Sequence, residues 1–183
     1  LMADQLGASA LGAYGHKLVK TPNIDTLVQR GAVFDNFYSS FPLCAPARLA
    51  LMTGRLCSNI QAWDNAAQIP SDIPTFAHYL RVLGYRTCLS GKMHFIGPDQ
   101  LHGFEERVTT DICPSDFNWT ADWDDPWRTM DWFHDMKNVS NAGIAERALQ
   151  QDYDEDVAHN ARRWIFDWAR DPHPRPFMLV ASF

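Results

Sequence analysis

Two neighbouring apolar patterns near the end of the chain constrain the fold most. Segment 152–170 carries apolar residues at every third or fourth position, which predicts an amphipathic helix that packs on a core. The run 177–183, PFMLVASF with its leading proline, predicts a buried strand directly after that helix. The stripe on the helix consists of Val157, Ala161, Trp164, Ile165 and Trp168.

The same order of helix and strand is predicted upstream. A helix is expected over 73–83, ending at Gly84, and a strand over 85–89. Further helices are expected from Pro22 to Gly31 and over 47–52, a strand over 32–38, and the tail of a strand in the opening LMADQ. Alternating elements of this kind predict the α/β class with a mostly parallel central sheet flanked by helices. Ligand sites in such sheets collect at the carboxyl ends of the strands.

Composition narrows the class of protein. The chain has 183 residues, of which 46% are hydrophobic, so it can bury one sizeable core. Its 16 basic and 22 acidic residues give a net charge of −6, and without a basic run we expect no nucleic-acid partner. No apolar run approaches the length of a membrane span, so we expect no membrane contact and a cytoplasmic protein.

The two ends and one internal segment shape the expected domain organisation. The chain opens without Met and stops inside an apolar run, so we expect residues 1–183 to be a piece truncated at both ends. Segment 96–143 holds most of the prolines and tryptophans and has no steady period. A long irregular excursion within a compact domain is usually functional.

The segment SFPLCAPARLALMTGR, residues 40–55, raises the sharpest question about chemistry. Cys44 directly precedes a predicted helix, whose N-terminus stabilises negative charge. Pro46 fixes the entry of the chain, and Arg48 lies one helical turn after Cys44. The alternative is a buried thiol with a surface arginine nearby.

Two other pairs follow predicted strands. Asp4 and Gln5 offer a carboxylate and an amide oxygen, which suit a hard cation, although an aspartate at a strand end also commonly caps a turn. Lys92 and His94 are two residues apart, so on a strand they would face one side and one anion. A solvated surface pair is the alternative for these two residues.

The residues around Cys44 resemble a known family. Cys44, Pro46 and Arg48, followed by Thr53-Gly54-Arg55, are similar to the signature of the sulfatases. The resemblance implies an alkaline-phosphatase-like fold, of which this chain is the N-terminal part of the catalytic domain. It also implies that a maturation enzyme oxidises Cys44 to formylglycine, whose hydrated aldehyde attacks sulfur with one hydroxyl and expels sulfate with the other.

The resemblance assigns roles to the remaining candidates. Asp4, Gln5 and the residue derived from Cys44 would bind a divalent metal, Ca²⁺ first and Mg²⁺ or Mn²⁺ as alternatives, although the family more often has two aspartates at the first pair. Lys92 would contact formylglycine and sulfate, and His94 would orient or deprotonate the spare hydroxyl. The catalytic set is Cys44, Arg48, Lys92 and His94.

Segments 64–81 and 90–119 resemble the choline-sulfatase branch of the family, which implies choline-O-sulfate as the substrate. Trp119 and His134 would then bind the quaternary ammonium in a pocket formed by the excursion 96–143, because aromatic faces attract such cations. The alternatives are a phosphonate or phosphate monoester hydrolase of the same superfamily and a truncated chain without activity. We expect a homo-oligomer for the full-length protein and no activity for the isolated piece.

Overall fold

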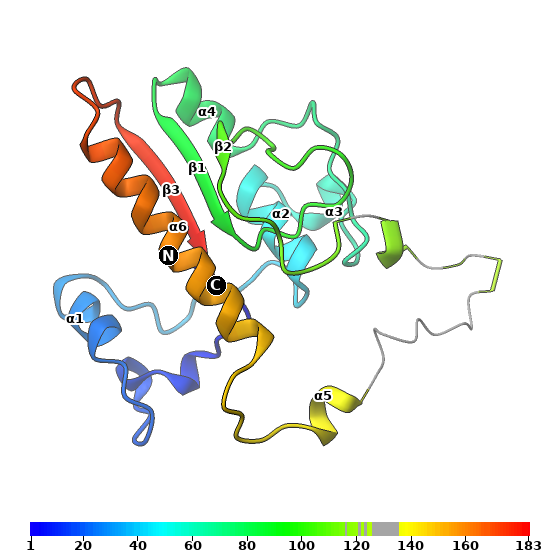
Figure 1. The fold of residues 1–183 in the computed structure, drawn as a ribbon. Helices are drawn as coiled ribbons and strands as arrows, with labels where there is room; N and C mark the ends of the chain where they lie inside the picture. Colours follow the sequence, from blue (N-terminus) through cyan, green and yellow to red (C-terminus); the bar gives the residue numbers. More distant parts are fainter. Residues whose placement is uncertain (116, 121, 123, 126–135) are drawn as a thin grey trace. The chain divides into compact units, whose positions relative to one another are not determined.

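The computed structural model describes residues 1–183 except 116, 121, 123 and 126–135 (Figure 1). The described residues form two compact units, one of residues 3–39 and one of residues 1–2 and 40–183. The smaller unit contains two short 3-10 helices, η1 (Ala8–Ala10) and η2 (Gly12–Tyr14), and helix α1 (Pro22–Arg30). Helix α1 confirms the predicted helix, with proline in its first turn and Gly31 as its C-cap.

Of the two strands predicted near the N-terminus, the one over 32–38 is wrong, and the strand tail in LMADQ is present only as a single paired residue. Residues 32–38 form no strand; they contain a turn and are all exposed. The loose alternation of apolar residues in this segment lacks a neighbouring strand to pair with, and without a ladder an isolated strand does not persist. In the opening residues only Met2 pairs, through a parallel bridge to Ser182, and Asp4 and Gln5 already belong to a turn.

A three-stranded parallel sheet in the order β2-β1-β3 is the centre of the larger unit and confirms the predicted α/β class. Strand β1 (Arg86–Gly91) pairs with β3 (Phe177–Ser182) along its whole length, in a register that joins Arg86 to Phe177 and Gly91 to Ser182. The short strand β2 (Glu106–Arg107) pairs with the other edge of β1. Both outer strands therefore run parallel to β1, so their carboxyl ends lie at one edge of the sheet.

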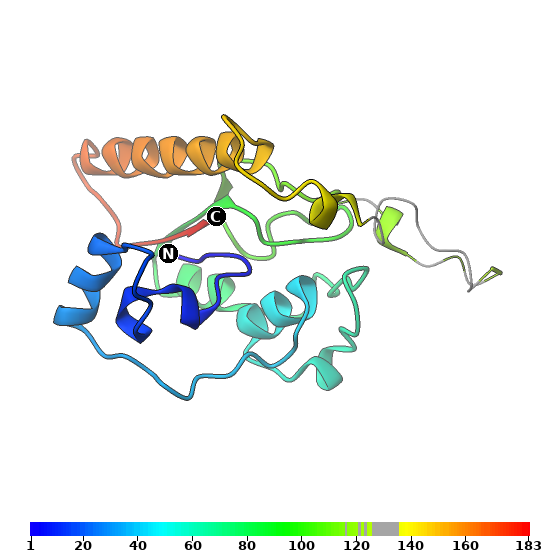
Figure 2. The same ribbon diagram turned by 90° about the horizontal axis from the view of Figure 1, so that it is seen from below.

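Helices cover both faces of this sheet. Figure 2 shows α6 (Leu149–Ala169) on one face and α2 (Cys44–Thr53) with α4 (Phe76–Val82) on the other. Helix α6 confirms the predicted amphipathic helix. None of the helices in the described ranges is long and apolar enough to cross a membrane. The remaining elements are α3 (Cys57–Ile60), η3 (Phe117–Trp119) and α5 (Lys137–Ser140).

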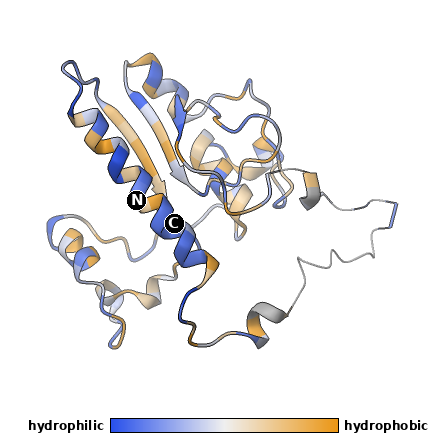
Figure 3. Cartoon of the chain, in the orientation of Figure 1, coloured by the Kyte–Doolittle hydropathy of each residue, from blue (hydrophilic) through white to orange (hydrophobic). Residues whose placement is uncertain are grey.

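The main core lies between the sheet and the two helices α2 and α4. Leu89 on β1 is fully buried, and it packs in one cluster with Leu49 of α2 and Ala77 of α4. Strand β3 is apolar along most of its length, whereas β2 is polar and α6 alternates between apolar and polar residues (Figure 3). The start of the excursion contributes to this core as well, because Phe104 belongs to the same cluster, as does Phe95 directly before the excursion.

Gly91 ends β1 at the point where the chain turns toward the candidate site. Its φ is 103°, and a Cβ at this position would lie 1.9 Å from the carbonyl oxygen of Ser182 on β3. Gly84 precedes the same strand with a φ of 85°, but nothing lies within 4 Å of where its Cβ would be. The two glycines share a left-handed conformation and differ in the space around them.

We predict that Gly91→Ala lowers the free energy of unfolding by about 3–5 kcal/mol, through backbone strain and a clash with β3. The matched control Gly84→Ala meets only the strain and costs about 1–2 kcal/mol. Urea denaturation of the longer protein that carries these residues measures both values. Equal losses for the two variants would contradict the close approach of β1 and β3.

Candidate active site

Cys44 is the first residue of α2, at the amino end of that helix. The N-cap residue Leu43 offers no side-chain hydrogen bond, but the buried Asn65 accepts one from the Ala45 N–H at 3.1 Å. Asn65 thus satisfies one of the orphan donors of the first turn from a distant loop. The expected strand before Cys44 is absent, and residues 40–43 form bends. The helix begins three residues before the predicted 47–52.

Lys92 brings a positive charge to Cys44. Its Nζ lies 3.6 Å from the Cys44 Sγ, across 48 residues of sequence, and its side chain is 7% exposed. The prediction that Lys92 and His94 share one face of a strand is wrong, since β1 ends at Gly91 and His94 has a φ of 59°. The two side chains instead project from the turn that follows the strand.

Arg48 is buried and connects three elements. Its Nη1 donates to the Lys92 carbonyl oxygen at 2.5 Å and to the Ser182 Oγ at 3.0 Å. Helix α2 is thereby attached to the carboxyl ends of β1 and β3. The guanidinium holds the backbone of Lys92 in place and adds positive charge to the same region.

His94 is almost completely buried, with 2% of its surface exposed. Neither ring nitrogen makes a hydrogen bond of good geometry with the described residues, although the Asn65 backbone is near enough to favour the protonated ring weakly. Burial, followed by the charge of Lys92, lowers the pKa of His94 from 6.5 to about 4. The imidazole is therefore neutral at pH 7, with one ring nitrogen able to accept a proton and the other carrying a hydrogen that it can donate.

Trp119 lies against His94, with 4.9 Å between the ring centroids. Its indole N–H donates to the Pro114 carbonyl oxygen at 2.8 Å, which fixes the orientation of the ring. The structure thus places Lys92 beside Cys44 and Trp119 beside His94, with the charge of Lys92 near enough to act on His94, and the roles of these residues stay predictions. His134 lies outside the described residues.

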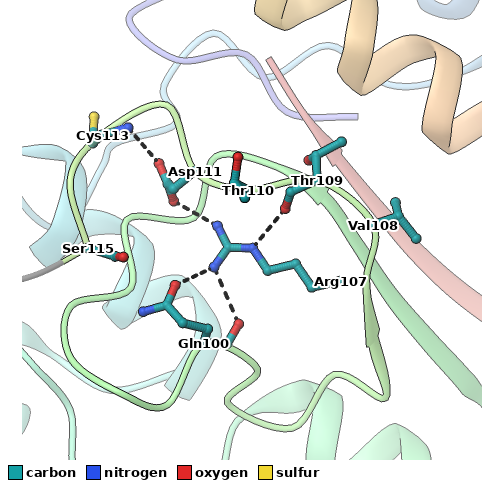
Figure 4. Close-up of a pocket in the computed structure, with 8 residues that line it drawn as sticks. All are labelled: Gln100, Arg107, Val108, Thr109, Thr110, Asp111, Cys113 and Ser115. Atoms are coloured by element: carbon teal, nitrogen blue, oxygen red, sulfur yellow. Dashed lines mark hydrogen bonds and ion pairs between the residues drawn. The ribbon is translucent and has the colours of Figure 1, made fainter.

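A hydrogen-bonded loop that contains Arg107 and Asp111 contacts the Lys92–His94 turn, because Asp111 accepts from the backbone N–H groups of this turn. Figure 4 shows the Arg107 guanidinium at its centre, bonded to Gln100, Thr109 and Asp111 in a cavity of about 370 Å³. Cys113 lines the same cavity, and burial raises the pKa of its thiol, an effect that the nearby Lys92 partly offsets. All residues that line this cavity lie between Gln100 and Ser115, in the part of the chain that follows Lys92 and His94.

The predicted metal ligands are only partly tested by the geometry. Asp4 and Gln5 lie in the unit of residues 3–39 and Cys44 in the other unit, so their joint binding of a metal stays a prediction. Among the described residues, no three His, Cys, Asp or Glu side chains gather as a metal cage. The carboxylate of Asp4 and the amide oxygen of Gln5 suit a hard divalent cation, but these two residues and residue 44 are fewer ligands than such a cation requires.

Sequence reasoning missed Asn65, Asp111 and Cys113 at this site. Asn65 and Asp111 contact it through backbone N–H groups 17–20 residues away, as in the bond from His94 N–H to Asp111 at 2.7 Å. A spacing pattern does not reveal contacts of this kind. Their only signal was that both lie in the two segments, 64–81 and 90–119, that resemble one branch of a family most closely.

Solved structures define the class of fold. The chain superposes over its full length on a putative sulfatase from Bacteroides thetaiotaomicron, with a TM-score of 0.68 at 23% identity, and it covers 33% of that chain. It also superposes fully on the phosphonate monoester hydrolase of Agrobacterium radiobacter, with a TM-score of 0.63 at 22% identity, and covers 39% of it. The fold is thus the expected alkaline-phosphatase-like α/β fold.

Sequence similarity then identifies the family. The family model described as Sulfatase matches residues 1–183, and the chain belongs to the sulfatase family. It is 48% identical over 187 aligned positions to the choline-sulfatase of Rhizobium meliloti strain 1021. The chain is covered completely in that alignment but spans only 36% of the length of this relative.

The low pKa of His94 predicts a pH dependence of stability. The unfolded ring takes up a proton near pH 6.5 and the folded ring only near pH 4, so stability is present above pH 6.5 and is lost as the pH falls toward 4. Between pH 7 and pH 5, the wild type should lose about 2 kcal/mol more than His94→Gln. Urea denaturation of the full-length protein at both values measures this difference.

The exposed His173 provides the control, because His173→Gln removes an imidazole from the surface. This variant should follow the wild type at both pH values. Parallel losses in wild type and His94→Gln would show that the folded ring is protonated as readily as the unfolded one.

Proposed function

We propose that the full-length protein containing this chain is a sulfuric ester hydrolase that converts choline-O-sulfate and water to choline and sulfate. The observation that carries the proposal is the approach of the Lys92 ammonium to Cys44 at the amino end of α2, at 3.6 Å. The 48% identity to a choline-sulfatase over the whole chain supports the choice of substrate.

In this proposal Cys44 is the precursor of formylglycine, made by a maturation enzyme. In Cys44 the Cβ carries the Sγ. In the hydrated aldehyde the same Cβ would carry two hydroxyl oxygens instead. A geminal diol supplies a nucleophile that can release sulfate without attack of water on sulfur, which neither a thiol nor a serine can do. The amino end of α2 stabilises the negative charge that develops at this position.

The surrounding side chains act on charge and protons. Lys92 binds a sulfate oxygen and the nucleophile, and the buried Arg48 keeps the Lys92 backbone at the required distance. His94, neutral at pH 7, accepts the proton of the second hydroxyl at a ring nitrogen. Its burial excludes water from this proton transfer.

A divalent cation completes the proposed site, and Ca²⁺ is the first choice. Asp4 and Gln5 would hold it together with the oxygen derived from Cys44, and further ligands would come from outside residues 1–183. When bound, the cation lowers the pKa of the nucleophile and holds sulfate oxygens. Because the chain spans 36% of its relative, we propose that residues 1–183 alone are inactive.

The choline end of the substrate requires a different kind of recognition. A quaternary ammonium has no hydrogen to donate, so an aromatic face is the favourable contact. Trp119 lies against His94 and is thus near the reacting group, and His134 would add a second ring. For the cellular setting we propose a cytoplasmic homo-oligomer that needs neither nucleic acid nor membrane.

We predict that Trp119→Ala raises the KM for choline-O-sulfate by about 2- to 30-fold, which corresponds to the loss of about 0.5–2 kcal/mol of cation–π attraction. The KM for 3,3-dimethylbutyl sulfate, in which an uncharged tert-butyl group replaces the trimethylammonium, should change much less. Steady-state hydrolysis by the full-length protein measures both values, with Trp168→Ala on α6 as the control.

The same assay separates the alternative activity. A phosphonate monoester offered to the wild type should be hydrolysed far more slowly than choline-O-sulfate. Preference for the phosphonate, or equal effects of Trp119→Ala on choline-O-sulfate and on 3,3-dimethylbutyl sulfate, would contradict the proposed substrate.

A further inference from the structure

One buried carboxylate collects hydrogen bonds from four donors beside the candidate site. Asp111 Oδ2 accepts from the Met93 N–H at 2.9 Å, the His94 N–H at 2.7 Å and the Arg107 Nη2 at 3.1 Å. Its Oδ1 accepts from the Cys113 N–H at 3.2 Å. The side chain is only 3% exposed, and none of the steps proposed above uses it.

Arg107 fixes this carboxylate from behind. Beyond its bond to Asp111, the guanidinium donates to the Thr109 carbonyl at 3.1 Å and to the Gln100 Oε1 at 2.6 Å (Figure 4). With 9% of the side chain exposed, the arginine is nearly enclosed by its acceptors. A guanidinium held on several sides has one orientation, and it therefore gives the carboxylate one orientation.

The turn that bears Lys92 and His94 needs such support. Pairing with β3 ends at Lys92, whose N–H donates to the Ser182 carbonyl at 3.0 Å, so the next two N–H groups have no strand to bond. His94 has a left-handed φ of 59°, which costs a residue with a side chain about 1–2 kcal/mol. Two successive N–H groups that point at one anion form a nest, and the carboxylate of Asp111 fills it.

We propose that Asp111, oriented by Arg107, is a positioning residue that holds the Lys92–His94 turn in line with Cys44. The inference rests on the proposed function for its catalytic consequence, and its structural part stands without it. Asp111 contacts no reacting group in this account. It acts through the backbone of the two residues that do.

The chain contains a matched ion pair that lacks this connection. Arg86 and Glu106 join β1 to β2 through two hydrogen bonds, at 2.6 and 3.2 Å, near the opposite end of β1 from Gly91. Glu106→Gln therefore removes one charge from an arginine–carboxylate pair in the same sheet without touching the turn. It serves as the control for a general loss of stability.

The test compares Asp111→Asn with Glu106→Gln in the full-length protein. Hydrogen exchange of the backbone amides of Met93 and His94 should become at least about tenfold faster in Asp111→Asn and stay unchanged in Glu106→Gln. For choline-O-sulfate, kcat should fall about 10- to 100-fold in Asp111→Asn with KM changed less than about threefold, because a small displacement of catalytic groups costs the transition state most.

Each outcome decides the inference. Wild-type exchange at both amides, or a kcat within twofold of wild type in folded Asp111→Asn, overturns it. If Asp111→Asn does not fold, Arg107→Lys replaces it, and faster exchange at the same amides is again expected. If the wild type hydrolyses no choline-O-sulfate, the proposed function fails, and the exchange measurement alone still decides whether Asp111 holds the turn.

Discussion

The arrangement of the candidate site depends on one buried guanidinium. Arg48 lies on α2, and its Nη1 bonds the carbonyl of Lys92 and the hydroxyl of Ser182, so one group connects a helix to the ends of two parallel strands. A charged group is tolerated in the interior only when it has such partners. Without them, the burial of the guanidinium would lower the stability of the fold. Because Cys44 begins the same helix and Lys92 carries the bonded carbonyl, this connection sets the distance between the two.

Three further supports complete this frame. Gly91 lets β1 and β3 approach so closely that the chain can turn at Lys92, and Asp111 receives the two N–H groups that the turn leaves without a strand partner. Asn65 does the same for the first turn of α2. Two loops that are distant in sequence thus supply acceptors to backbone donors near the carboxyl edge of the sheet, where α/β folds usually hold their ligands.

The sequence predicted elements whose pattern is local and missed contacts that are not. The stripe on 152–170 and the run 177–183 became α6 and β3, because a period of 3.6 and a continuous apolar run are properties of the segment itself. The segment 32–38 has a weaker pattern, and strand formation depends on a partner that the sequence does not name. Cys44, Lys92 and His94 could be selected from their motifs, whereas Asn65 and Asp111 act through backbone bonds that only the folded chain reveals.

The proposed catalysis depends most on the chemical identity of residue 44. The direct test is the intact mass of the Cys44 peptide, taken from the full-length protein made in a host with the maturation enzyme. Conversion of the thiol to the aldehyde lowers the mass by about 18 Da, and the account predicts this loss. An unchanged thiol in such a host would contradict it, because the proposed nucleophile would not exist and Lys92 would lie beside an ordinary cysteine.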